Sequence, residues 1–476
     1  MMIDISSKDT FYMYNAYHIA KAFFPNGEIR QKVDEGQEPL IRLELEGGSC
    51  FSIPADSILQ YPDKREAKQY VTKLIYDYLS EMTGTSLSWG MLTGVRPTKL
   101  IMQKLETGVS EKDIVKFLRS VYSVSSEKAA LGCEIARREQ ELLQKLDADQ
   151  GYSLYIGIPF CPSICSYCSF GSSPLDKWPG GTELYLDALC KEITAIGQAA
   201  RGRKLNTIYI GGGTPTTLSA QQLERLLRLL DSIFSYADLK EFTVEAGRPD
   251  SITREKLEVL AGHPVTRISV NPQTMQQKTL DAVGRRHRVE DVKTVFYLAR
   301  ELGFDNINMD LIAGLPGEDA EDMQDTLRQI EELGPDSLTV HVLAIKRAAR
   351  YGQEGRKVEL HSEITQMVED SAKASKKMGL EPYYLYRQKN MAGNFENVGY
   401  AKVDKAGIYN ILIMEEKQTI LAAGAGASTK IVLPEKIGLE NGRQSNLVRI
   451  ENVKDIRSYI ERIDEMIERK GEWLWR

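Results

Sequence analysis

Three cysteines lie close together in the segment PFCPSICSYCSF (159–170). Cys161, Cys165 and Cys168 follow the spacing C-x3-C-x2-C. Thiolates are the usual ligands of iron–sulfur clusters, and three thiolates on a cubane of four irons leave one iron open. An open coordination position is typical of catalytic rather than structural metal sites. The spacing therefore predicts a [4Fe–4S] cluster whose open iron can chelate the amino and carboxylate groups of a methionine-like ligand.

Two other interpretations of the cysteines are weaker. A structural zinc site needs a fourth ligand, and the following segment, 171–181, contains no Cys or His. Cys190 lies at an apolar position of the next predicted helix, so we expect it in the core. Three unrelated buried cysteines are improbable at this density. The context therefore favours a cluster over zinc.

Further candidate residues follow predicted strands. GGGTPT (211–216) comes directly after one strand, and glycines allow a backbone to approach a ligand closely. An ordinary tight turn is the alternative; a phosphate-binding loop would need the absent GK[ST]. Glu245 ends the strand FTVEA, where it could accept hydrogen bonds from ribose hydroxyls or an ammonium group. The alternative for Glu245 is a solvated charge at a strand end.

Three more polar residues could bind a small ligand. Gln273 lies just past a strand. Asp310 lies inside an apolar strand, and a buried carboxylate needs a donor. Arg285 carries a forked guanidinium that suits a carboxylate partner, although it could equally be a surface charge. His287 and His341 also lie near strand ends or loops, where we favour structural roles for them.

A regular alternation of strands and helices must position these residues. Each of six predicted strands is followed by a predicted helix, which favours a parallel sheet with right-handed connections and helices outside. Six units are too few for a closed eight-fold barrel, so we expect an open partial (β/α)6 barrel of the α/β class. Its chemistry should lie at the carboxyl ends of the strands. The strands are 153–158, 206–210, 241–246, 266–270, 305–312 and 336–342.

The flanking regions do not show this regular alternation of strands and helices. Residues 1–148 are predicted to form an N-terminal α+β domain of unknown role, with a hairpin at 41–48 and 50–54. Its predicted helices are 65–84, 111–123 and 125–146. The partial barrel should cover 149–380. Residues 381–476 should form a C-terminal α+β extension that covers the substrate, with two strands around a turn in 410–429.

Composition narrows the functional classes. The chain has 476 residues, of which 42% are hydrophobic, and its net charge is 61 − 67 = −6. Such an acidic balance argues against general nucleic-acid binding. The N-terminus does not have the pattern of a signal peptide, and we expect no membrane span. A cytoplasmic location follows, where clustered cysteines suggest metal binding rather than disulfides.

The cysteine segment resembles that of a known enzyme superfamily. C-x3-C-x-aromatic-C resembles the signature of the radical S-adenosylmethionine (radical SAM) superfamily. YIGIPFCPSICSYCSF (155–170) is most similar to the oxygen-independent coproporphyrinogen III dehydrogenases of haem synthesis, in their HemZ-type form. The resemblance covers about residues 150–430, and MLTGVRPTKL (91–100) is similar to the HemZ-type N-terminal extension.

The resemblance implies a radical SAM partial barrel that binds a [4Fe–4S] cluster and one or two S-adenosylmethionine molecules. It implies that Cys161, Cys165 and Cys168 hold the cluster. The residues that it implies for S-adenosylmethionine are Tyr155, Tyr167, Gly212, Gly213, Thr214, Glu245, Gln273, Arg285, Asp310 and Ala344.

The resemblance further implies oxidative decarboxylation of coproporphyrinogen III to protoporphyrinogen IX. That reaction needs a reductant such as flavodoxin or ferredoxin, and an electron acceptor. Arg387, Lys389 and Lys430 are our candidates for binding the substrate propionates. Two positions depart from the better-known members: Gly157 replaces a His, and Phe170 replaces a Cys that is not a cluster ligand. Both departures concern the identity of the substrate rather than the cluster. They leave two alternatives: a haem chaperone, or a radical enzyme that acts on another tetrapyrrole.

Overall fold

The computed structural model describes residues 1–147, 150–346, 349–355, 363–388, 395–438 and 444–474. An eleven-stranded sheet dominates this part of the chain, in the order β13-β14-β12-β11-β10-β9-β8-β5-β15-β16-β17. All six strands expected for the barrel are present and pair in parallel. They are β5 (Gly151–Ile158), β8 (Lys204–Gly212), β9 (Glu241–Gly247), β10 (Arg267–Val270), β11 (Ile307–Ala313) and β12 (Ser337–Val342).

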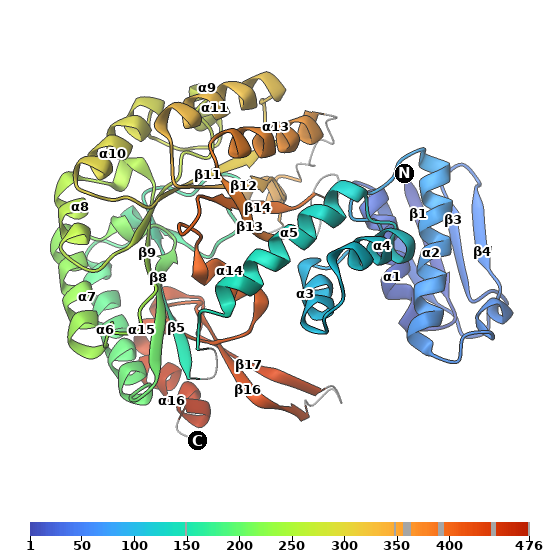
Figure 1. The fold of residues 1–476 in the computed structure, drawn as a ribbon, viewed down its shortest axis with the longest axis horizontal. Helices are drawn as coiled ribbons and strands as arrows, with labels where there is room; N and C mark the ends of the chain where they lie inside the picture. Colours follow the sequence, from blue (N-terminus) through green and yellow to red (C-terminus); the bar gives the residue numbers. More distant parts are fainter. Residues whose placement is uncertain (148–149, 347–348, 356–362, 389–394, 439–443, 475–476) are drawn as a thin grey trace.

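Helices cover the outer face of these strands and form an arc around the sheet (Figure 1). They are α6 (Gly181–Ala199), α7 (Ala220–Ile233), α8 (Arg254–Ala261), α10 (Val289–Glu301), α11 (Ala320–Leu333) and α13 (Glu363–Lys377). A short helix, α9 (Gln277–Ala282), precedes α10. The predicted partial barrel is therefore confirmed. None of the helices that the structure describes is long and apolar enough to cross a membrane.

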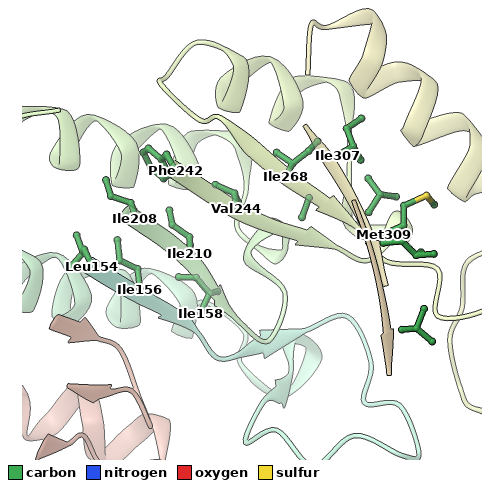
Figure 2. Packing of buried hydrophobic residues seen from close by; sticks show 14 of the residues in the cluster. Leu154, Ile156, Ile158, Ile208, Ile210, Phe242, Val244, Ile268, Ile307 and Met309 are labelled. Carbon is green, nitrogen blue, oxygen red and sulfur yellow. The ribbon is translucent and has the colours of Figure 1, made fainter. Parts of the chain in front are cut away.

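Alternating residues of the strands build the layer between sheet and helices. Leu154, Ile156 and Ile158 of β5 are fully buried, and Figure 2 shows them in one cluster with Ile208 and Ile210 of β8. Successive side chains of a strand point to opposite faces, so the residues between these apolar ones face the barrel interior. This alternation places polar side chains of the strands in the barrel interior.

Two more sets of strands extend the sheet on either side of the parallel strands. On one side β15 (Thr419–Ala423) pairs in parallel with β5, followed by the hairpin of β16 (Ser428–Gly438) and β17 (Gln444–Glu451). On the other side β14 (Asn397–Ala401) and β13 (Glu381–Tyr386) pair antiparallel. The prediction of two strands in 410–429 was wrong in its first half, because Ile408–Glu415 forms helix α14. Periodicity alone cannot tell a short buried helix from a buried strand.

A separate four-stranded sheet lies near the N-terminus, in the order β2-β1-β3-β4. Its elements are β1 (Met2–Ser7), α1 (Thr10–Phe23), β2 (Glu28–Val33), β3 (Ile41–Leu45), β4 (Cys50–Ile53) and α2 (Lys64–Thr83). The antiparallel pairing of β3 and β4 confirms the expected hairpin. This sheet and its two helices have a hydrophobic core of their own, which includes Ile3, Leu43 and Ile75.

Three helices connect this sheet to the barrel: α3 (Thr98–Glu106), α4 (Glu111–Tyr122) and α5 (Ser126–Leu143). Their buried residues Ile101, Leu118 and Ile135 belong to the core of the barrel rather than to the N-terminal core. The three-part division of the chain stays a prediction. The packing indicates that α3–α5 are held by the barrel.

One arginine of α5 ties that helix to the edge of the large sheet. The guanidinium of Arg138 is half-buried and donates to four main-chain carbonyls, those of Glu381 (2.6 Å), Pro382 (3.3 Å), Ala401 (3.2 Å) and Lys402 (3.2 Å). The first two belong to β13, and the other two lie at and just past the end of β14. A single side chain therefore holds the edge strand β13 and its neighbour β14 against α5.

A buried carboxylate anchors the C-terminal elements to α6. Glu192 is fully buried and accepts hydrogen bonds from Gly424 N (2.8 Å), Asn452 Nδ2 (2.8 Å) and Tyr459 Oη (2.6 Å). It also pairs with Lys470, which is itself buried. Tyr459 lies on α15 (Ile456–Glu461), and Lys470 lies on α16 (Ile463–Leu474). Four segments distant in sequence thus meet at one carboxylate.

We predict that Lys470→Met destabilises the protein by about 3 kcal/mol, because removing one partner of a buried ion pair leaves the other charge uncompensated. The exposed pair of Lys191 and Asp464 on the same two helices is the control, and Lys191→Met should cost less than about 1 kcal/mol. Urea unfolding of both variants measures the difference. Equal costs for the two substitutions would contradict the prediction.

Candidate active site

A cavity of about 560 Å³ opens at the carboxyl ends of the parallel strands. This volume lies in the usual range for ligand pockets. The structure brings almost all of the predicted site residues to its wall. These are Cys161, Cys165, Tyr167, Cys168, Gly212, Gly213, Thr214, Glu245, Gln273, Arg285, Asp310 and Ala344.

Tyr155 is the exception. It does not line the cavity; its ring lies beside the rings of Tyr209 and Tyr409, nearly parallel to both, with centroid distances of 6.2 Å and 6.0 Å. Tyr209 and Tyr409 also stack on each other at 4.4 Å. Tyr409 comes from α14, so the C-terminal region contributes to this aromatic layer. A contact of Tyr155 with a cofactor stays a prediction, and in the structure the residue supports the wall from behind.

Each of two cluster thiols has a hydrogen-bond donor nearby. The hydroxyl of Thr214 lies 3.4 Å from Cys161 Sγ. Nη1 of Arg248 and Nη1 of Arg285 lie 3.9 Å and 4.0 Å from Cys165 Sγ. Donors of this kind stabilise thiolates, the form that binds metal.

The thiols are not gathered around one point. In the part of the chain that the structure describes, no three His, Cys, Asp or Glu side chains are close enough to hold a single metal ion. Zinc draws its ligands to about 2.0–2.3 Å, whereas a cubane binds each thiolate through a different iron and needs them farther apart. The three cysteines line one cavity, and this set of three thiolates fits a [4Fe–4S] cluster.

Short hydrogen bonds attach the cysteine loop to the turn after α9. Ser166 N donates to Val283 O (3.0 Å), and Ser163 Oγ donates to Gly284 O (3.1 Å). The carbonyl of Ser166 in turn accepts from the backbone of α12 (Arg350–Gln353), at Tyr351 N (3.0 Å). The loop is thus held from two sides.

The glycine loop after β8 runs directly against the cysteine segment. Gly213 N donates to Ile158 O and Thr214 N to Phe160 O, both at 2.7 Å. A Cβ at position 213 would lie 2.5 Å from Phe160 O, so only glycine fits. The close approach seen here is between two protein segments that border the cavity, and the approach of this backbone to a ligand stays a prediction.

Glu245 faces the cavity from the end of β9. Its carboxylate accepts a short hydrogen bond from Tyr209 Oη. Burial raises the pKa of Glu245 to about 7, although the hydrogen bond from Tyr209 lowers it. A Cβ at Gly211 would lie 2.7 Å from the carboxylate, so this glycine gives Glu245 its space.

Asp310 is part of a polar chain along the cavity floor. Asn308 Nδ2 donates to Asp310 Oδ1 (2.7 Å), and His341 Nε2 lies 3.9 Å from Asp310 Oδ2. Burial raises the pKa of Asp310, but the contacts with His341 and Asn308 lower it by more, so it lies below its usual range. Tyr386 Oη lies 3.2 Å from His341 Nδ1. The carboxylate is thus ionised and oriented before any ligand arrives.

Gln273 has an unusual backbone. Its φ is +70°, in the left-handed region that disfavours side chains with a Cβ. Two hydrogen bonds impose this conformation: Gln273 N donates to Asp310 O and Ile312 N donates to Gln273 O, both at 2.9 Å. Strain of this kind is kept where the surroundings over-determine the backbone, and it is common at functional sites. It directs the amide toward the cavity next to Asp310.

Sequence reasoning missed several wall residues. Arg248 lies just past the end of β9, so the strand-end rule could have found it. Arg267 is 2% exposed and begins β10, where no local signal marks it. Tyr384 and Tyr386 of β13 line the cavity from the C-terminal region. The C-terminal region therefore contributes to the cavity wall, and its covering of a substrate stays a prediction.

Arg387 and Lys430, two of the three predicted propionate-binding cations, do not line the cavity. Arg387 is 5% exposed and donates to the carbonyls of Leu92 and Phe395. Lys430 donates to Ile413 O (2.9 Å) and pairs with Glu416. Both side chains have partners within the protein, and a role of these two residues in binding the substrate propionates stays a prediction. Lys389 lies outside the described residues.

The two histidines near the site differ. His341 lines the cavity, whereas His287 is 1% exposed and lies behind the wall. Neither ring nitrogen of His287 has a hydrogen-bond partner among the described residues. Burial, with the nearby positive charge of Arg285, lowers the pKa of His287 to about 4, so the ring is neutral at pH 7.

The cysteine loop, the glycine loop and the strand-end polar residues match a known family. The model of the radical SAM superfamily matches residues 155–330. The chain is 41% identical over 423 residues to the oxygen-independent coproporphyrinogen-III oxidase-like protein HemZ of Bacillus subtilis, covering 87% of this chain and 82% of the relative. The chain belongs to this HemZ-type family of the radical SAM superfamily. Its cofactors are accordingly a [4Fe–4S] cluster and S-adenosylmethionine.

Two further comparisons place this HemZ-type chain among its relatives. It is 37% identical over 210 residues to the haem chaperone HemW of Bacillus subtilis, covering 44% of this chain and 55% of the relative. The solved structure of coproporphyrinogen III oxidase (HemN) from Escherichia coli superimposes with a TM-score of 0.55 and 24% identity, over 69% of this chain and 73% of that one. The latter likeness establishes a shared fold.

Glu245 makes the stability of this HemZ-type protein depend on pH. The pKa of Glu245 is about 7 in the folded chain against an ordinary value of 4.5. The folded state therefore binds this proton more tightly, and stability falls as pH rises from about 4.5 to 7. We predict that Glu245→Gln removes up to about 3 kcal/mol of this loss. Urea unfolding at pH 5.5 and pH 8 measures it.

Glu258→Gln, which removes a carboxyl half-exposed on the outer surface, controls for the substitution itself. A Glu245→Gln variant whose unfolding free energy follows the wild-type pH profile would show that Glu245 is already ionised at pH 5.5.

The left-handed backbone of Gln273 gives a second prediction. Gln273→Gly should be more stable than Gln273→Ala by up to about 1 kcal/mol, because only glycine adopts φ near +70° without strain. At Gln103, which is exposed in the interior of α3, the order should reverse, because alanine is favoured over glycine inside a helix. Thermal unfolding of the four variants tests this, and the same order at both positions would be the contrary result.

Proposed function

We propose that this chain is an oxygen-independent coproporphyrinogen III dehydrogenase that oxidatively decarboxylates two propionate side chains to vinyl groups, giving protoporphyrinogen IX. Each propionate loses one hydrogen atom, one carbon dioxide and one electron. The electron requires an acceptor outside the chain, and the cluster requires a one-electron reductant of the flavodoxin or ferredoxin class.

One observation carries the proposal. The same cavity extends from the three cysteines to Tyr384, Tyr386, Asn410 and Met414 of the C-terminal region. A ligand beside the cluster can therefore share one enclosed space with a second, organic ligand under this region. The extent of the match to the HemZ relative, which covers 87% of this chain, supports the same assignment.

The residues of this chain have distinct roles in the proposal. When bound, the cluster and S-adenosylmethionine supply one-electron chemistry that abstracts a hydrogen atom. Glu245 and Asp310 accept hydrogen bonds from hydroxyl or ammonium groups of the ligand. Arg285 donates to Tyr167 Oη (3.3 Å) and Asn271 O (2.6 Å), and its Nε has no partner among the described residues. That free donor suits a ligand carboxylate.

The C-terminal region excludes water from this site. Ile413 and Met414 add apolar surface to the wall, and exclusion of water protects a reactive intermediate from side reactions. Phe170 is 73% exposed and lies at the edge of the cavity, where an aromatic face is available to a planar ring. It takes the place of the cysteine found in the better-known members.

Two alternatives share the cysteines. The partial match to haem chaperones supports a haem-binding role without decarboxylation, and a radical enzyme acting on another tetrapyrrole would use the same site. In the first case we expect stable haem binding without turnover. In the second, we expect a product of different mass.

Anaerobic incubation of the reconstituted protein with coproporphyrinogen III, S-adenosylmethionine and a reductant tests the proposal. We predict a product that has lost two carboxyl groups, detected by mass spectrometry, together with methionine and 5′-deoxyadenosine. Cys165→Ala is the control and should abolish all three. Haem binding without these products would support the chaperone instead.

A further inference from the structure

Two arginines converge on one cluster ligand. Nη1 of Arg248 lies 3.9 Å and Nη1 of Arg285 lies 4.0 Å from Cys165 Sγ. Both arginines are 5% exposed or less. Cys161 Sγ, in contrast, lies beside the neutral hydroxyl of Thr214. Positive charge is therefore concentrated at Cys165.

Arg248 uses both edges of its guanidinium. Nε and Nη2 form a forked pair with the carboxylate of Asp250, at 3.0 Å and 2.6 Å. Nη1 donates to Ser163 O (2.8 Å) and Ser163 Oγ (2.9 Å) and faces Cys165. The rigid fork holds the positive edge toward the thiol and the negative partner on the far side.

The other charged groups near this pair are few. No carboxylate of the described residues lies within 4.0 Å of the guanidinium of Arg285. His287, which lies near Arg285, Arg248 and Asp250, is neutral at pH 7 because burial lowers its pKa to about 4. Two cations and one anion therefore leave an excess of one positive charge beside Cys165.

We propose that Arg248 and Asp250 set the reduction potential of the cluster, Arg248 raising it and Asp250 lowering it. The inference rests on the cluster assigned under the proposed function. One electron added to the cluster, supplied by an external reductant, increases its negative charge. A nearby cation stabilises that charge strongly, because the site is buried and weakly screened. Net charge and hydrogen bonds to the sulfurs are established determinants of cluster potentials.

A purely mechanical role predicts something different. If Arg248 only fastened the cysteine loop through Ser163, then loss of either partner would loosen the same ion pair. Arg248→Gln and Asp250→Asn would then affect the cluster in the same direction. If charge matters, the two substitutions act in opposite directions, because one removes a cation and the other leaves that cation uncompensated.

The test is a redox titration of the reconstituted full-length protein, followed by the electron paramagnetic resonance signal of the reduced cluster without substrate. We expect Arg248→Gln to lower the midpoint potential and Asp250→Asn to raise it. Each shift should correspond to about a tenfold change in the reduction equilibrium, which is 59 mV for one electron. Arg248→Lys, which keeps the charge, should lie closer to wild type than Arg248→Gln.

Arg254→Gln is the matched control. Its side chain is 47% exposed on α8 and pairs with Glu301, so the same loss of charge occurs where water screens it. The potential of this variant should equal that of the wild type.

Iron and sulfide content separate the possible failures. A wild-type chain that binds no cluster overturns the proposed function and this inference together. A cluster that forms but whose potential does not move, or moves in the same direction in both variants, overturns the inference alone. If Arg248→Gln does not hold a cluster, Asp250→Asn decides: a higher potential supports the inference, and an unchanged or lower one overturns it.

Discussion

Two backbone hydrogen bonds, from Gly213 to Ile158 and from Thr214 to Phe160, hold the glycine loop against the segment that leads into the cysteines. There is no space for a side chain between these segments. The rest of the site depends on this contact, because the thiols come from one loop whereas the other candidate ligands come from neighbouring strand ends. If the two segments separated, Thr214 would lose its contact with the thiol of Cys161.

Local patterns predicted the barrel well. The six strands and the helices between them follow from apolar periodicity and helix-terminal residues, such as the capping box at Ser219 and Gln222. The pairing of β15 beside β5 could not be predicted, because nothing within Thr419–Ala423 encodes a partner that is more than 250 residues away. α14 was mistaken for a strand for a different reason: its short apolar run fits either a buried helix or a buried strand.

The site was predictable to the extent that it follows from strand ends. Carboxyl ends of parallel strands meet at one edge, so Glu245 and Asp310 had to lie near the cysteines. The partners of the charged side chains could not be predicted in this way. The sequence shows that Arg387 and Lys430 are cations, but their internal carbonyl and carboxylate partners are set by tertiary packing. Arg267 was missed for a related reason: its burial depends on several strands at once.

The bonds of Arg138 restrict how a bulky molecule can enter. β13 contributes Tyr384 and Tyr386 to the cavity wall, so swinging this strand outward would be the simplest way to widen the cavity. The guanidinium of Arg138 holds the start of β13 and the end of β14 to α5 through four carbonyls, and such a hinge would have to break these bonds together. Widening the cavity at β13 would therefore cost the loss of all four bonds at once.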